Sequence, residues 1–593
     1  MRNFDFRGLR ALFLVAMTAL VISCGGGGSS GSASSSPTEP APTPAPEPEP
    51  TPEPEPLSEA EAARFLSQAT FGPSSEAIET LVPLGLEDWL LEELEKPPTL
   101  HLASVLSGFP PDGSFVDENG NPLPEVVLLA SDSFWKTAIE ADDQLRQRVA
   151  YALSQILVVS ASSNLFRAPQ AVAHYMDILT EGAFGNYRDL LEAVTYSPAM
   201  AVYLTYLRNE KADPATGRVP DENYARELLQ LFTVGLVELN PDGTPVTAQG
   251  GGQVELYDNA DITELAKVFT GLSFQGAGFA TPLRQLPPQS LYSPLAMFNA
   301  YHSMEPKNFM GVQIPADTVG KKSIDMALDG IFGHPNMAPF LGRQLIQRFV
   351  SSAPSQDYVG RVAAAFNEGS YELPSGTAVG SGERGDLQAV VAAVLFDPDA
   401  RDVESIETVS SGKLREPVLR FTHWARAFEV NSADASNERI LRDTSSFELL
   451  GQHPYRSPSV FNFYRPGYIA PATETGAAEL TAPELQITNA SSIVGYPNFM
   501  TAFALGRTAQ VDPGLPKAFV ADYSEAASLA EDVPALLDYL DLLLTHRTLQ
   551  SETRERINSI LEALPANNAA DLELRAQVAS VLVMTAPEYI VLR

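Results

Sequence analysis

The segment ENYARELL, residues 222–229, carries polar side chains that are spaced for acid–base chemistry. Glu222 and Arg226 are four residues apart, as are Asn223 and Glu227, so each pair shares one face of a helix. One interpretation makes Glu227 a proton donor or acceptor and Arg226 a clamp for an anionic group. The other makes the same side chains an ion-pair network that joins helices. The spacing alone allows both.

His302, followed by Lys307, is the third candidate catalytic residue, because an imidazole titrates close to neutral pH. The other six histidines are scattered along the chain, and neither His-x-His nor His-Glu-x-x-His occurs. A metal site needs three or four converging ligands, which distant residues would have to supply. The sequence therefore identifies no metal site and no cofactor.

Two loop-like segments, GKLREP at 412–417 and RSPSVFNFYRPG at 456–467, are rich in groups that recognise polar ligands. Polar side chains on loops of a helical scaffold are strong candidates for binding. Aromatic rings would stack on sugar faces, while cations and amides would bind hydroxyl or carboxylate groups. Alternatively, the rings belong to the core and the arginines bond loop carbonyls. The candidate ligand-binding residues are Lys413, Arg415, Arg456, Ser459, Asn462, Tyr464 and Arg465.

The first 23 residues predict an export signal that is cleaved before Cys24, where a lipid is attached. Three arginines precede a short apolar run at 11–22, and glycines follow Cys24 directly. An ordinary secretory signal with an incidental cysteine is the alternative. Gly25, which follows the acylated cysteine, predicts that the lipoprotein is located in the outer membrane. Because Cys24 is the only cysteine, its acylation would exclude disulfides and thiolate chemistry from the folded part.

The composition then divides the chain into a linker and a folded part. Residues 24–57 are Gly- and Ser-rich and then Pro- and Glu-rich, and the proline segment predicts a polyproline II spacer of roughly 60 Å. Residues 58–593 predict an α-helical domain, with a possible division at the glycine-rich stretch 369–385. The formal net charge of −35 repels nucleic acid, so a DNA- or RNA-binding role is the least favoured.

The elements that must position these residues are mainly helices, with few short strands or hairpins. Ser58 to Glu61 has the cap and early acids of a helix start, and residues 145–160 repeat apolar side chains at helical spacing. Further predicted features are an Asp221 cap before 222–232, a capping box from Asp261 to Glu264, a helix starting at His334-Pro335, and a hairpin or ordered loop at 237–246.

Several motifs in order resemble a bacterial family known as domain of unknown function 1800, and the resemblance covers about residues 58–593. The matching stretches include AARFLSQATFGP (62–73), LRQRVAYALSQILVVS (145–160), ENYARELLQLFTVGL (222–236), DITELAKVFTGL (261–272), HPNMAPFLGRQLIQRFV (334–350) and LGQHPYRSPSVFNFYRPGY (450–468). The resemblance implies an exported protein, often encoded beside a second exported protein related to sulfatases and alkaline phosphatases. It implies no reaction, because the activity of the family is not established.

One position departs from the family pattern. The family commonly has His-Asp before a Lys-x-x-x-Gly segment, whereas this chain has His302-Ser303 before Lys307. A carboxylate beside the histidine is therefore missing, unless Glu305 replaces it. Any acid–base work that the pair performs in relatives is in doubt in this chain.

Two functions remain open, and the sequence does not decide whether the protein is an enzyme. The chain contains no Gly-x-Ser-x-Gly elbow, phosphate-binding loop, dinucleotide glycine motif or Ser-x-x-Lys. The first hypothesis is a cell-envelope lipoprotein with a binding or assembly role beside the phosphatase-like companion. The second is a hydrolase of an extracellular polymer such as a polysaccharide.

Overall fold

The computed structural model describes residues 56–110, 123–402, 410–431, 441, 443–508 and 519–593. The predicted signal, the lipidated Cys24 and nearly all of the predicted linker lie outside the described residues. Residues from Pro56 to Arg593 form one compact unit, and the contacts do not divide it at 369–385.

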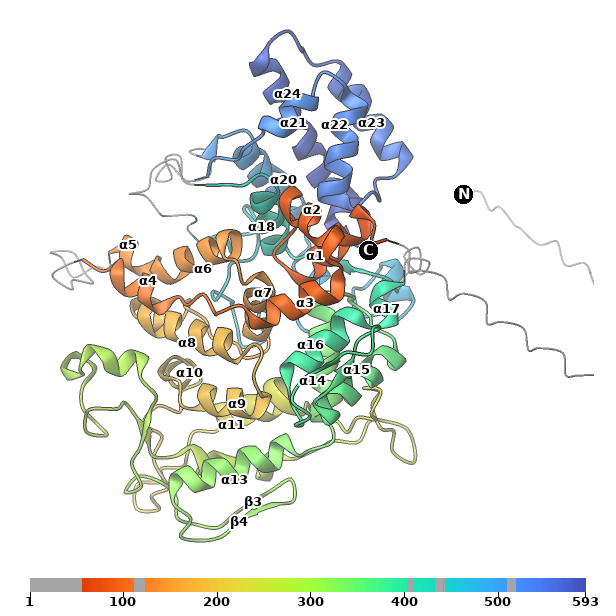
Figure 1. The fold of residues 1–593 in the computed structure, drawn as a ribbon. Helices are drawn as coiled ribbons and strands as arrows, with labels where there is room; N and C mark the ends of the chain where they lie inside the picture. Colours follow the sequence, from red (N-terminus) through yellow and green to blue (C-terminus); the bar gives the residue numbers. More distant parts are fainter. Residues whose placement is uncertain (1–55, 111–122, 403–409, 432–440, 442, 509–518) are drawn as a thin grey trace, which may run out of the picture. The chain divides into compact units, whose positions relative to one another are not determined.

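The prediction of a mainly α-helical fold is confirmed (Figure 1). The first half contains α1 Glu59–Ala69, α2 Ser75–Leu84, α3 Leu86–Glu95, α4 Leu102–Ser107, α5 Pro124–Val127, α6 Leu129–Glu140, α7 Gln144–Ser154, α8 Pro169–Gly182, α9 Tyr187–Thr195, α10 Pro198–Tyr203, α11 Asn223–Glu227 and α12 Asn259–Ala266. The second half contains α13 Gly320–Phe332, α14 Met337–Phe349, α15 Gln356–Glu368, α16 Leu387–Phe396, α17 Pro398–Arg401, α18 Pro417–Ala427, α19 Glu474–Ala477, α20 Ala490–Ala504, α21 Ser524–Leu529, α22 Val533–Leu540, α23 Ser551–Glu562, α24 Ala569–Met584 and α25 Pro587–Ile590.

The strands of the described residues are short and pair two by two, all antiparallel. Three of the pairs join neighbouring segments, but the fourth joins residues far apart in the sequence: β7 pairs Lys413 with Leu592 and Leu414 with Val591 of β8. The pairs are β1 Leu272–Ser273 with β2 Ala296–Met297, β3 Lys307–Phe309 with β4 Val312–Ile314, β5 Tyr371–Glu372 with β6 Ala378–Val379, and β7 Lys413–Leu414 with β8 Val591–Leu592.

The helix start predicted at Ser58 is confirmed. The Ser58 hydroxyl accepts from the backbone N–H of Glu61, and the Glu61 carboxylate accepts from the backbone N–H of Ser58, which completes a capping box. The helix predicted within 145–160 is α7, which ends at Ser154 and is buried along its whole length. Because α7 has no solvent face, its polar side chains must find partners inside the protein.

Three predicted helix starts are displaced from their predicted residues. The capping box before α12 joins Asp258 to Asp261, three residues earlier than predicted. The N-cap of α11 is Glu222, although Asp221 still accepts from the backbone N–H of Asn223 at 2.9 Å. Helix α14 begins at Met337, and the His334 ring accepts from the backbone N–H of Asn336 at 3.1 Å.

The predicted hairpin at 237–246 is an ordered loop held by isolated bridges, among them one from Leu239 to Pro245. Its partner segment includes Gln253 and Glu255, which bridge to Thr247 and Val237. The loop therefore folds back on residues that follow it, without forming a regular strand.

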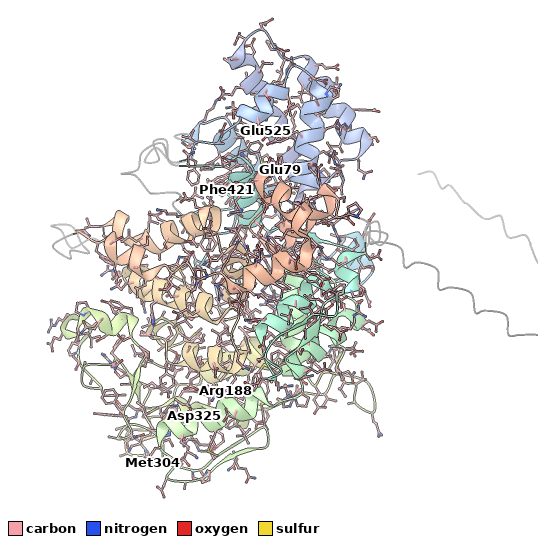
Figure 2. The ribbon with its side chains drawn as sticks, viewed as in Figure 1. Glu79, Arg188, Met304, Asp325, Phe421 and Glu525 are labelled. Carbon is pink, nitrogen blue, oxygen red and sulfur yellow. The ribbon has the colours of Figure 1, made fainter. Side chains whose placement is uncertain are left out.

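An aromatic cluster in the core links α18 to helices before and after it. The ring of Phe421, labelled in Figure 2, lies 5.5 Å from that of Trp135 on α6 and 5.2 Å from that of Phe503 on α20. Edge contacts between rings at such distances stabilise a core beyond the area that they bury. Within the described residues, no helix combines the length and the apolar character that a membrane span requires.

Candidate functional site

A cleft of about 670 Å³ lies between the C-terminal end of α7, the segment after α11, the side of α14 and the loop at 460–469. Its size is within the range of small-ligand sites in proteins. The lining residues are Gln155, Ile156, Gln230, Leu231, Gly235, Leu236, Val237, Gln253, Phe340, Gln344, Val460, Phe461, Tyr464, Arg465, Pro466, Gly467, Tyr468 and Ile469.

One wall of the cleft is a π-helix. Helix α11 is followed directly by the π-helical turn Leu228–Thr233, which supplies Gln230 and Leu231 to the cleft. A π-turn carries one extra residue per turn, is rare, and is found frequently at functional sites. The extra residue changes the direction of the side chains that follow Glu227. The side chains of 228–233 that face the cleft are therefore not the ones that α-helical spacing predicts.

Gly235 allows the wall to approach α14 closely. Its φ is +77°, in the left-handed region that favours glycine. A Cβ atom built there would lie 3.0 Å from the ring of Phe340. The backbone after the π-helix therefore packs directly against this ring, and Gly235 and Phe340 both line the cleft.

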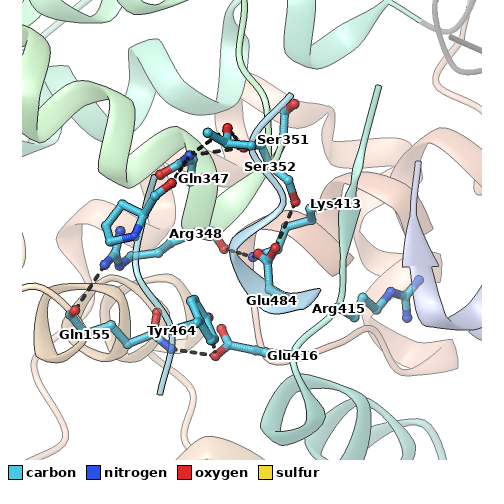
Figure 3. Close-up of polar contacts among 12 residues, drawn as sticks. Gln155, Gln347, Arg348, Ser351, Ser352, Lys413, Arg415, Glu416, Tyr464 and Glu484 are labelled. Atoms are coloured by element: carbon cyan, nitrogen blue, oxygen red, sulfur yellow. Dashed lines mark hydrogen bonds and ion pairs between the residues drawn. The ribbon is translucent and has the colours of Figure 1, made fainter. Parts of the chain in front are cut away.

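The floor of the cleft is tied to a buried carboxylate (Figure 3). Glu416 is fully buried, and its Oε2 atom accepts from the Tyr464 hydroxyl at 2.9 Å and from the Gln155 amide at 2.6 Å. Tyr151 and Gln452 donate to the same oxygen. Burial raises the pKa of Glu416, but Lys413 and Arg148 outweigh it, so the pKa lies below the usual range and the group is ionised.

Arg348 on α14 fixes the other side of the floor. Its guanidinium donates to the backbone carbonyls of Gln344 at 2.7 Å and Gln155 at 3.0 Å. The Gln347 amide donates to the carbonyl of Pro466 at 3.0 Å and so attaches the loop to the helix (Figure 3). The loop, α7 and α14 are therefore cross-linked beneath the cleft before any ligand binds.

The chemistry of the lining is aromatic and amide-rich. Four rings, four glutamine side chains and one charged group, Arg465, line the cleft, and none of its described lining residues is acidic. The Arg465 guanidinium lies 4.6 Å from the centre of the Phe461 ring, which orients it by a cation–π contact. Two buried floor atoms, Gln155 Oε1 and Gln344 Nε2, have no hydrogen-bond partner among the residues that the structure describes. Such a surface can stack on and hydrogen-bond to a neutral polar ligand.

A second cleft, of about 610 Å³, offers less specific chemistry. Its lining is mostly aliphatic, and its hydrogen-bonding side chains are those of Asn164, Arg167 and Thr205. A polar ligand would find few directional partners there, so the first cleft is the better candidate site.

The structure brings only part of the predicted ligand-binding set to the cleft. Tyr464 and Arg465 line it. Ser459 and Asn462 form the turn that shapes the loop, because the backbone N–H of Asn462 donates to the Ser459 carbonyl at 3.1 Å. Asn462 has a φ of +59° and is buried, so it sets the backbone. Arg456 pairs with Asp443 at 2.9 Å, outside the cleft.

Lys413 and Arg415 are buried and lie in a separate polar cluster behind the cleft. Lys413 Nζ donates to the Arg348 carbonyl at 2.8 Å and pairs with Glu484 at 3.4 Å. The Arg415 guanidinium donates to the ring of His423 at 2.6 Å. Neither cation lies on an open surface, because the pairing of β7 with β8 carries both into the core.

The predicted catalytic residues are dispersed. Glu227 is buried at the end of α11, and burial raises its pKa, with Arg226 opposing the shift. Arg226 is half-exposed and pairs with Glu222 at 3.3 Å, the ion pair that its spacing allows. Within the described residues, no hydrogen bond or ion pair joins Glu227 to Arg226 or His302, and none of the three lines the cleft.

His302 is buried, and its ring is held by hydrogen bonds within the fold. Its ring bonds the Thr270 carbonyl at 2.8 Å and the Ser323 hydroxyl at 3.2 Å, and burial lowers its pKa to about 4. Lys307 Nζ donates to the Ser303 carbonyl at 2.8 Å. Glu305, the predicted replacement for the missing carboxylate, is mostly exposed and pairs with Lys267 at 3.2 Å instead.

Sequence reasoning did not identify the four glutamines and Phe340 as site residues. Glutamine on a helix carries no motif, and these residues come from four separate segments. The aromatic composition of the loop at 456–467 was the sequence feature that pointed to this part of the protein. In the described part of the chain, no group of three or more His, Cys, Asp or Glu side chains is arranged to hold a metal ion.

The comparisons with known proteins agree with the resemblance. The family model described as "Protein of unknown function (DUF1800)" matches residues 64–591. The chain belongs to this family. No match was found among curated proteins or among solved structures. Every segment of the cleft lies within the DUF1800 match, so the cleft is part of the family domain.

Proposed function

We propose that this DUF1800 protein is an exported envelope lipoprotein whose cleft binds a neutral oligosaccharide. The single observation that supports the ligand class is the cleft lining of aromatic rings and glutamine amides around one cation. Rings stack on the apolar faces of sugars, and amides donate to and accept from hydroxyl groups. The net charge of −35 makes a polyanionic ligand less favourable.

Binding is favoured over the alternative, hydrolysis of a polysaccharide. Glycosidic cleavage generally uses two carboxyl groups that flank the scissile bond. None of the described lining residues is Asp or Glu, and the nearby Glu416 is buried behind Tyr464 and ionised. A phosphatase- or sulfatase-like companion, if present in the envelope, would then supply chemistry that this cleft does not.

A binding experiment tests the cleft. A glycan array that carries neutral oligosaccharides of bacterial cell envelopes is screened with the wild-type protein. The affinity for each oligosaccharide that binds is then measured by calorimetry for the wild-type protein and for the Tyr468→Ala and Arg465→Ala variants. Loss of an aromatic anchor should weaken binding about tenfold or more. Tyr292→Ala, which removes a partly buried ring outside the cleft, is the matched control and should bind normally.

The cleft proposal fails if no neutral glycan binds, or if Tyr468→Ala and Tyr292→Ala bind equally well. Metabolic labelling with a palmitate analogue tests the anchor separately. Label should enter the wild-type protein and be lost in Cys24→Ala, and label that persists in the variant would contradict lipidation at this residue.

A further inference from the structure

A small enclosed cavity lies behind the cleft, in the polar cluster that Lys413 and Arg415 join. Its volume, measured as the space that the centre of a water molecule can occupy, is about 10 Å³. This is enough for one water molecule or one monatomic ion. Arg148, Lys413 and Arg415 line it together with Ser67, Thr70 and His423. Three residues with cationic side chains therefore contribute to the wall of this space.

These cations are fully enclosed by protein. Arg148 is 1% exposed, Lys413 2% and Arg415 3%. A buried charge costs free energy unless a partner of opposite charge or several hydrogen bonds compensate it. The arrangement of their partners therefore decides what the cavity must contain.

Within the described residues, the hydrogen bonds of Arg148 leave most of its guanidinium without a partner. Nη2 donates to the Arg348 carbonyl, whereas Nε and Nη1 have no acceptor in this part of the chain. The guanidinium also lies 4.6 Å from the centre of the Phe349 ring, another residue of the cavity wall. No carboxylate of the described residues forms an ion pair with it.

Arg415 is likewise not paired with a carboxylate among the described ion pairs. Its acceptors are the ring of His423 at 2.6 Å, the ring of His546 at 3.4 Å and the Leu544 carbonyl at 3.4 Å. The His546 ring also bonds the Ser67 hydroxyl at 2.6 Å. Burial is the main cause that lowers the pKa of both imidazoles, which keeps them neutral, and Arg415 retains its charge because its pKa falls only to about 10.

The whole cluster has more cations than anions. Its described carboxylates are Glu416 and Glu484, and Glu484 lies 3.4 Å from Lys413. The cationic members are Arg148, Arg348, Lys413, Arg415 and Arg420. Two negative charges facing five positive ones leave an excess that an anion in the cavity would compensate.

We propose that the cavity lined by Arg148, Lys413 and Arg415 binds one monatomic anion of the halide type. Its size excludes acetate, phosphate and sulfate. Arg148, one of the lining residues, has two guanidinium nitrogens without an acceptor among the described residues, and a halide would accept charge-assisted hydrogen bonds from them. The ion would join α1, α7 and β7 at a point adjoining the floor of the cleft. Its role is to stabilise the fold, independently of the proposed sugar site.

The first test is crystallographic and uses the wild-type full domain. Crystals soaked in sodium bromide should give an anomalous peak in this cavity, within hydrogen-bonding distance of Arg148. An electron-density peak with no anomalous signal would identify water and overturn the proposal, as would bromide confined to surface sites.

The second test measures stability in solution. At constant ionic strength, replacing gluconate by chloride or bromide should raise Tm in a saturable manner, by about 1–3 °C, because an ion that binds only the folded state stabilises it. Arg148→Gln should remove the halide dependence. Arg575→Gln is the control: this buried arginine bonds the carbonyls of Ala530 and Leu564 far from the cavity, so the halide shift should remain.

A Tm that is equal in gluconate and halide overturns the proposal, and so does a halide shift that Arg148→Gln leaves intact. If Arg148→Gln does not fold, the bromide peak of the wild-type protein decides. Neither test of the halide site measures glycan binding. Failure of the halide proposal is therefore distinguishable from failure of the oligosaccharide proposal.

Discussion

At the scale of single residues, Glu416 connects the two sites. Its carboxylate accepts from Tyr464, which lines the cleft, and lies in the electrostatic field of Lys413 and Arg148, which line the enclosed cavity. The carboxylate is the compensating charge for those cations, and its removal would leave them uncompensated inside the protein. Removing one member of a buried charged group is strongly destabilising for that reason.

Replacing Glu416 by glutamine should therefore lower the free energy of unfolding by about 3–5 kcal/mol, measured by urea denaturation. The amide that replaces an acceptor would also face the donors of Gln155 and Gln452. Glu552→Gln is the control, because the ion pair of Glu552 with Arg556 is exposed to solvent and contributes little to stability. An equal or larger loss in Glu552→Gln would contradict this account of the cluster.

At the scale of elements, local patterns in the sequence predicted which segments form helices, but not always the residue at which each helix begins. The capping box of Ser58 with Glu61 depends on four consecutive residues, and it forms as predicted. The box at α12 was predicted three residues late, because Asp258 and Asp261 satisfy the same spacing rule as Asp261 and Glu264. Local patterns thus identify a helix more reliably than its first residue.

The composition of the cleft and of the cluster behind it depends on contacts between residues that are far apart in the sequence. Nothing in LLQLFT distinguishes a π-turn from an α-helix, yet the π-turn places Gln230 and Leu231 in the cleft wall. Lys413 and Arg415 were predicted to bind ligand on an exposed loop, but pairing of β7 with the last residues of the chain buries them. The loop at 456–467 was predicted as a candidate region from its aromatic composition, and its residues 460–467 contribute to the cleft wall.

At the scale of the whole molecule, the buried histidines determine how stability depends on pH. Burial lowers the pKa of His101 and His302 to about 4 and that of His453 to about 3, and it lowers the pKa values of His423 and His546 well below the usual value. All five are neutral in the folded state at neutral pH, whereas in the unfolded chain each titrates near 6.5.

The sign of the effect follows from proton binding. Below pH 6.5 the unfolded chain binds protons that the folded state does not, so stability present above pH 6.5 is lost as the pH falls. Each such histidine contributes up to about 1.4 kcal/mol per pH unit. Asp177, whose pKa burial raises to about 6, acts in the opposite direction, as do Glu93, Glu227 and Glu484, whose pKa values burial also raises. The five histidines outnumber these four carboxyl groups.

We therefore expect the free energy of unfolding, measured in urea between pH 7.5 and 5.0, to be highest at neutral pH and to decrease steeply below 6.5. His302→Gln should reduce the slope by about one proton, because its ring is held by neutral partners, the Thr270 carbonyl and the Ser323 hydroxyl. A stability that is constant or rises on acidification would show that these rings are protonated in the folded protein.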